Sequence, residues 1–130
     1  MKASELQLGD WVQIVPDAPA MSNEYHRIDW IRTGEIGLDN RNIVTYPYIQ
    51  SIPLTLEILE KNGFDFFERN GHPSVMGMGP FELVYDYTCC CDIEKAFFLN
   101  VYGPRDIRID YVHQLQHVLK LCGISKEIVI

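Results

Sequence analysis

Turn-forming residues interrupt the first fifty residues so often that only short strands fit between them. Glycine, proline, aspartate and asparagine each favour turns through distinct backbone preferences. The segments between the turns are rich in branched and aromatic residues, as is typical of β-strands. The turn clusters are Gly9-Asp10, Pro16-Asp17-Ala18-Pro19, Thr33-Gly34 and Asp39-Asn40. About five short strands at this close spacing predict a small β-barrel.

The predicted barrel covers residues 1–53. Its opening run, Leu6-x-Leu8-Gly9-Asp10-Trp11-Val12, resembles the start of an SH3-like barrel, in which a turn feeds the first strand. Alternation along residues 25–31 predicts a strand with His26, Ile28 and Trp30 on one face. We expect Trp11 and Trp30 to fill the core, because this segment has few other large residues.

Residues 54–130 predict an α+β module. Thr55 is suited to cap a short helix, and Asn62-Gly63 is suited to end it. Alternating segments from 64 to 110 predict an antiparallel sheet with a hairpin turn at Asn70-Gly71. A closing helix should begin at an Asp110 cap and end at Gly123. The predicted fold class is therefore α+β: an N-terminal SH3-like small β-barrel, then a helix, an antiparallel sheet and a C-terminal helix.

The closing helix divides into an apolar and a polar side. The side that we expect to be buried carries Val112, Leu115, Val118, Leu119 and Cys122. The side that we expect at or near the surface carries His113, Gln116, His117 and Lys120. Burying two imidazoles and two amides would demand many hydrogen-bond partners, and this is the reason for the assignment. Tyr111 should cover the seam between the two sides.

The two histidines of this helix have the four-residue spacing of metal-binding helices. A zinc-protease helix also needs a glutamate directly after the first histidine, and position 114 is glutamine. No third ligand is indicated by the sequence. We therefore expect no bound metal and no cofactor, and we interpret His113, Gln116 and His117 as a solvated surface that could instead face a partner.

The formal net charge of −7 argues against a nucleic-acid surface, which needs clustered lysines and arginines. The same charge disfavours an anionic membrane surface. No apolar segment has the length of a signal peptide core or a membrane span, so we expect a cytoplasmic protein. Cys89, Cys90 and Cys91 are consecutive and Cys122 is distant, without a C-x-x-C pair, and we expect them to be reduced.

No complete catalytic motif is present in the sequence. The serines lack the flanking glycines of a nucleophile elbow, and Gly77-x-Gly79 does not open a helix as a phosphate loop must. Carboxylates, or a cysteine and a distant histidine, could still meet in space. A small hydrolase or a nucleotide-modifying enzyme is thus the alternative to a non-enzymatic protein-interaction module, which we favour.

Aromatic residues are concentrated in the predicted barrel, where SH3-like modules often use exposed aromatics to bind peptides. Together with the polar side of the closing helix they form our candidate interaction surface. Its members are Trp11, Tyr25, Tyr46, Tyr48, His113, Gln116 and His117.

Three blocks of the chain resemble small proteins from prophages and mobile elements of gut Bacteroidetes. The most specific block is Tyr111-Val112-His113-Gln114-Leu115-Gln116. The others are Ala3-Ser4-Glu5-Leu6 with Leu8-Gly9-Asp10-Trp11-Val12, and Ile52-Pro53-Leu54-Thr55 with Glu57-Ile58-Leu59 and Asn62-Gly63-Phe64. The resemblance spans most of the chain and brings no catalytic residues with it. It implies a phage-type accessory protein of the bacterial cytoplasm, with a host or phage protein as partner. It does not specify the oligomeric state.

Overall fold

The computed structural model describes residues 5–15, 24–69, 72–78, 81–87, 95–100 and 107–130. The chain forms two compact units. Unit 1 contains Met1–Pro53 and Tyr111–His113, and unit 2 contains Leu54–Asp110 and Gln114–Ile130. The chain therefore leaves unit 1 after Pro53 and returns to it through Tyr111 and the first two residues of the C-terminal helix. Asn70-Gly71 and Cys89–Cys91 lie outside the described residues.

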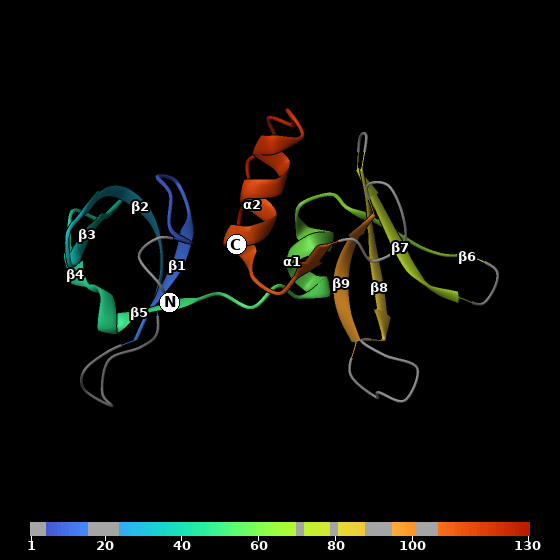
Figure 1. The fold of residues 1–130 in the computed structure, drawn as a ribbon, viewed down its shortest axis with the longest axis horizontal. Coiled ribbons are helices and arrows are strands. Elements are labelled where there is room, and N and C mark those ends of the chain that lie inside the picture. The colour runs from blue at the N-terminus through green and yellow to red at the C-terminus, as the bar shows by residue number, and fades with distance from the viewer. Residues whose placement is uncertain (1–4, 16–23, 70–71, 79–80, 88–94, 101–106) are drawn as a thin grey trace. The chain divides into compact units, whose positions relative to one another are not determined.

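Unit 1 contains a five-stranded antiparallel sheet with the order β4-β3-β2-β1-β5 (Figure 1). Its elements are β1 (Trp11–Ile14), β2 (Glu24–Arg32), β3 (Glu35–Leu38), β4 (Ile43–Thr45), the 3-10 helix η2 (Tyr46–Tyr48) and β5 (Ile49–Ser51). The long strand β2 pairs with β1 through residues 24–27 and with β3 through residues 28–32. The strand pairs leave β4 and β5 as the two edges, so hydrogen bonds do not close this sheet into a barrel.

The core of unit 1 is aliphatic. Its buried cluster consists of Leu6, Val12, Ile28, Ile36, Leu38 and Ile49, with Ile14, Val44 and Tyr46 packed against it. Trp11 and Trp30 are only half-buried and do not belong to this cluster. The expectation that the two tryptophans fill the core is wrong. Short branched side chains from the five strands already fill the small interior of unit 1.

Unit 2 contains a second five-stranded antiparallel sheet, with the order β10-β9-β8-β7-β6. Its strands are β6 (Asp65–Arg69), β7 (His72–Met78), β8 (Phe81–Tyr87), β9 (Lys95–Asn100) and β10 (Ile107–Ile109). Each strand pairs with the next along the chain, as in a meander. The helix α1 (Leu56–Lys61) precedes this sheet, and α2 (Val112–Leu121) follows it. Antiparallel sheets with separate helices confirm the predicted α+β class.

The ends of α1 and the end of α2 confirm the local predictions. The Thr55 hydroxyl accepts a hydrogen bond from the Ile58 N–H at 3.3 Å, as an N-cap does. Gly63 and Gly123 follow α1 and α2 at φ angles of 81° and 71°, and the next N–H in each case bonds back to Leu59 or Leu119. At each helix end, a left-handed glycine followed by this backbone hydrogen bond is the arrangement of a Schellman motif.

The C-terminal segment of unit 2 is held by the buried side chain of Asn62. Its Nδ2 donates to the carbonyls of Ile58 and Val129, and its Oδ1 accepts from the Val129 N–H, each at 2.7 Å. Asn62 thereby satisfies both backbone groups of Val129 as a neighbouring strand would. The adjacent Ile128 is 1% exposed, so this clamp stabilises a residue at the chain end in the core.

Candidate functional site

The pairing register of β1 gathers aromatic side chains on one face of unit 1. Trp11 pairs with Arg27, and Gln13 pairs with both Tyr25 and Gln50. Directly paired residues point to the same side of a sheet, and alternate residues of one strand share that side. Just beyond this ladder, the carbonyl of Tyr48 in η2 accepts the Val15 N–H at 2.8 Å, which brings exposed Tyr48 beside the end of β1. We call this set the β1 outer face: Trp11, Gln13, Tyr25, Arg27, Tyr48 and Gln50.

The β1 outer face is open to solvent. Tyr25 is 48% exposed and Tyr48 is 39% exposed. The guanidinium of Arg27 lies 5.4 Å from the ring centre of Trp11, within the range of a cation–π contact. That contact joins two amphipathic side chains from neighbouring strands. Three residues that the aromatic content singled out, Trp11, Tyr25 and Tyr48, are thus brought together by the register.

Tyr46 lies elsewhere. It packs against the aliphatic core, and its hydroxyl donates to the carbonyl of Arg32 at 2.9 Å. This hydroxyl ties the 3-10 turn to the end of β2. The structure therefore places Tyr46 apart from the β1 outer face, in a position that supports the fold.

A β-bulge turns Trp30 away from the face that alternation predicts. Ile28 pairs with Leu38 while Trp30 pairs with Gly37, so two steps along β2 match one step along β3. Trp30 therefore points away from the face that carries Ile28, and the predicted common face is wrong. A Cβ at Gly37 would overlap the Trp30 indole, which means that the ring covers the bare glycine. Arg32 stacks over the same ring, 4.7 Å from its centre.

The polar side of α2 is only partly at the surface. Gln116 and His117 are half-buried, whereas His113 is 1% exposed. The prediction that His113 lies at the surface is wrong. Its ring stacks on Tyr111, with ring centres 5.8 Å apart, and both residues belong to unit 1. Val112, Leu115 and Leu119 are buried as predicted, whereas Val118 is half-buried and Cys122 is exposed.

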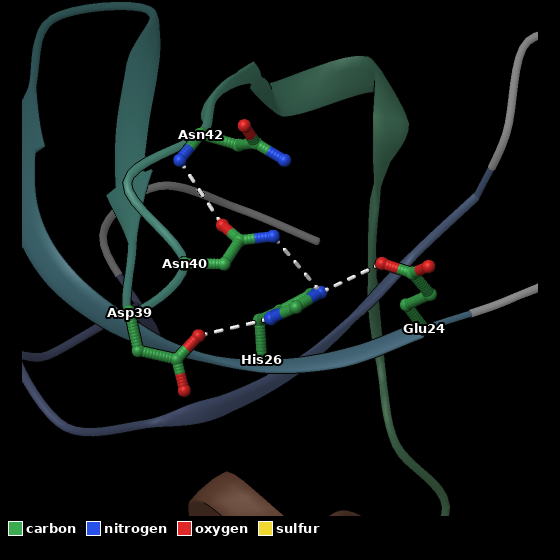
Figure 2. Close-up of polar contacts among 5 residues, drawn as sticks. All are labelled: Glu24, His26, Asp39, Asn40 and Asn42. Atoms are coloured by element: carbon green, nitrogen blue, oxygen red, sulfur yellow. Dashed lines mark hydrogen bonds and ion pairs between the residues drawn. The ribbon is translucent and has the colours of Figure 1, made fainter.

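A polar cluster that no sequence motif indicates surrounds His26 (Figure 2). His26 lies next to Tyr25 in β2 and so points to the opposite face. Its Nδ1 is 2.9 Å from Oδ1 of Asp39, and its Nε2 is 2.9 Å from Oε2 of Glu24. The Asn40 Nδ2 lies 3.3 Å from the same Nε2, while Asn40 Oδ1 accepts from the Asn42 N–H. The cluster thus links β2 to the turn between β3 and β4.

The two carboxylates favour the charged imidazolium. Desolvation of the ring lowers the pKa of His26, but the hydrogen bonds to Glu24 and Asp39 and their charges together raise it above 6.5. Desolvation likewise raises the pKa of Asp39, but hydrogen bonds from His26 and the Arg27 backbone bring it below 3.8. When His26 is protonated, both nitrogens donate to carboxylates. When it is neutral, Nε2 can instead accept from the Asn40 amide.

The described residues contain no group of three or more histidine, cysteine, aspartate or glutamate side chains arranged to hold a metal. In the His26 cluster both ring nitrogens already face carboxylates, which lie beside opposite nitrogens and do not converge on one point. Neither nitrogen therefore has a lone pair directed at a shared cation.

An assembled catalytic site would need a concave surface, and unit 2 has a groove of about 330 Å³. Its described lining consists of Leu54, Thr55, Leu56, Glu57, Tyr85, Ala96, Phe97, Ile109 and Asp110. This described lining offers two carboxylates without a histidine or a cysteine beside them. His26, whose pKa is raised, belongs to unit 1.

Comparison with known proteins adds no family: no family model matches the chain, and no curated protein or solved structure matches it. Neither helix of the described residues combines the length and the apolar character needed to cross a membrane.

Proposed function

We propose that this chain is a non-enzymatic protein-interaction module that binds its partner through the β1 outer face. The observation that carries the proposal is the exposure of Tyr25 and Tyr48 beside the Trp11–Arg27 pair on one side of a three-strand sheet segment. Tryptophan, tyrosine and arginine dominate the binding energy of protein interfaces. Gln13 and Gln50 between them offer amide donors and acceptors for a partner's backbone.

We assign unit 1 to the SH3-like barrels as part of the same proposal. Three features support the assignment: the strand order β4-β3-β2-β1-β5, the sharing of β2 between β1 and β3, and the 3-10 turn directly before β5. Modules of this kind bind extended peptides on aromatic surfaces. An extended segment with apolar side chains is accordingly the partner chemistry that fits this face.

The setting that we propose is the bacterial cytoplasm, with the chain acting as a phage-type accessory protein on a host or phage protein. The resemblance of the 111–116 block to prophage proteins supports the setting. The net charge of −7 supports a protein partner over a nucleic acid or an anionic membrane.

The test is a quantitative affinity purification from a prophage-bearing host with three tagged proteins: the wild type, the double variant Tyr25→Ser/Tyr48→Ser, and the control Ile43→Ser. Ile43 is 59% exposed and lies on β4, away from the β1 outer face, so the control removes exposed apolar surface from another part of unit 1. The proposal expects at least one protein to be retained by the wild type and the control and lost by the double variant.

The retained protein is then purified and titrated against the ¹⁵N-labelled chain. Saturable shifts of the Gln13, Tyr25 and Gln50 amides would support the face as the contact surface. An identical set of captured proteins for the double variant and the wild type would contradict the proposal.

A further inference from the structure

The groove in unit 2 has an aromatic floor built by strand register. Tyr85 pairs with Phe97, and Phe97 pairs with Ile109, so these three side chains form one row across β8, β9 and β10. The rings of Tyr85 and Phe97 stack with their centres 4.7 Å apart and their planes 28° apart. Phe97 is 5% exposed, whereas Tyr85 is half-buried, so the tyrosine presents the accessible ring.

The wall of the groove is the segment that enters α1. The Leu54 N–H donates to the Asp110 carbonyl at 2.9 Å, which ties this segment to the end of β10. Thr55 caps the helix, and Glu57 follows in its first turn, where it is exposed. The groove is therefore bounded by backbone hydrogen bonds and a capped helix, and its shape exists without a ligand.

The ionisable groups of the described lining, apart from the Tyr85 phenol, are both acidic: Glu57 and Asp110. The Oδ1 atom of Asp110 accepts from the Arg108 Nε at 2.7 Å, and its Oδ2 can still accept from a ligand. Two carboxylates that line one groove together with an aromatic ring attract a cation that is carried on an apolar stem. The ligand chemistry that complements this groove is therefore positive, planar and partly apolar.

We propose that this groove binds an arginine side chain of a partner protein. A guanidinium can stack on Tyr85 while it forks toward a carboxylate, which a lysine ammonium cannot do. A volume of about 330 Å³ lies at the lower end of ligand sites and suits one or two side chains. The groove belongs to unit 2 and is separate from the β1 outer face, so this site goes beyond the function proposed above.

The test uses the full-length ¹⁵N-labelled chain and the peptide Ac-Leu-Arg-Leu-NH2. We expect saturable amide shifts centred on Thr55, Glu57 and Asp110. The citrulline peptide Ac-Leu-Cit-Leu-NH2 has the same shape without the charge, and it should bind at least about tenfold more weakly because charge-assisted hydrogen bonds are lost. Ac-Leu-Lys-Leu-NH2 should also bind more weakly than the arginine peptide.

Variants assign the site to its residues. Glu57→Gln should weaken the arginine peptide about threefold, the scale of an exposed ion pair. Glu60→Gln is the control, since Glu60 is exposed on the same helix and does not line the groove, and it should leave binding unchanged. Tyr85→Leu should remove the preference for arginine over lysine.

Equal binding of the citrulline peptide, or shifts centred outside the groove, would overturn this assignment. So would equal affinity of free arginine amide, because the groove would then hold a small cation and not a partner's side chain. The Tyr25→Ser/Tyr48→Ser variant should bind the peptide normally. Loss of peptide binding and loss of the captured partner therefore report on two different surfaces.

Discussion

The clamp made by Asn62 predicts a large loss of stability on replacement. Asn62→Ala removes three hydrogen bonds of 2.7 Å from a side chain that is 3% exposed. At about 1 kcal/mol of net stabilisation for each bond, the three bonds contribute about 3 kcal/mol. The alternative response is detachment of the chain end, in which water hydrogen-bonds to Val129 and the cost is the exposure of Ile128, about 1.5–3 kcal/mol. We therefore expect the free energy of unfolding to fall by about 2–4 kcal/mol.

Asn62→Asp tests the direction of the hydrogen bonds. The aspartate keeps an acceptor for the Val129 N–H, but it places a second oxygen against the carbonyls of Ile58 and Val129, where the amide had donated. A buried carboxylate that faces carbonyl oxygens is strongly unfavourable. At pH 7 this variant should consequently be less stable than Asn62→Ala, and it should recover part of the difference when the carboxyl is protonated.

The assay is urea unfolding followed by circular dichroism, together with amide hydrogen exchange of the native protein. The Val129 amide should lose its protection in both variants, because its acceptor is gone or its segment is detached. Glu60→Ala, an exposed change on the same helix, should stay within about 0.5 kcal/mol of the wild type. An unchanged urea midpoint for Asn62→Ala with a still protected Val129 amide would refute the clamp.

Three further predictions concern the interior and the polar cluster of unit 1. Because the folded pKa of His26 is above 6.5, the His26 cluster should stabilise the fold fully below pH 6.5 and lose that stabilisation as pH rises through the folded pKa of His26. Folding lowers the pKa of Asp39, so the stabilisation that comes from the Asp39 carboxylate should be lost as pH falls below about 3.8. Urea midpoints of the wild type should therefore fall between pH 6 and pH 9, and a His26→Gln variant that shows the same fall would contradict this account. Gly37→Ala should destabilise by about 1–3 kcal/mol because its methyl overlaps the Trp30 indole, and simple additivity with Trp30→Ala in a double-mutant cycle would argue against that contact. His113→Ala should cost about 2–5 kcal/mol in thermal or urea unfolding, as for other buried large side chains, and a loss under about 1 kcal/mol would restore the surface assignment.

The candidate interaction face shows how far local patterns reach. Aromatic content alone singled out Tyr25 and Tyr48, and it could not place them together, because their adjacency runs through the β1 ladder. The His26 cluster joins residues thirteen positions apart in the chain. Its one local signal is Glu24, two residues before His26 on the same strand face, and that spacing is too common to indicate a site.

The sequence by itself determined the elements whose causes are local. A threonine that caps α1, glycines that end both helices and turns that separate short strands act within a few residues, so the α+β class, both C-terminal Schellman ends and the buried row of Val112, Leu115 and Leu119 could be predicted. Only the tertiary structure decided the bulge that redirects Trp30, the burial of His113 and the clamp between Asn62 and Val129. Each of these three features depends on which distant segment pairs or packs against the residue. The pairing that forms is the one that leaves the fewest unsatisfied polar groups and voids in the whole unit. A periodic pattern read along one segment contains no information about that partner.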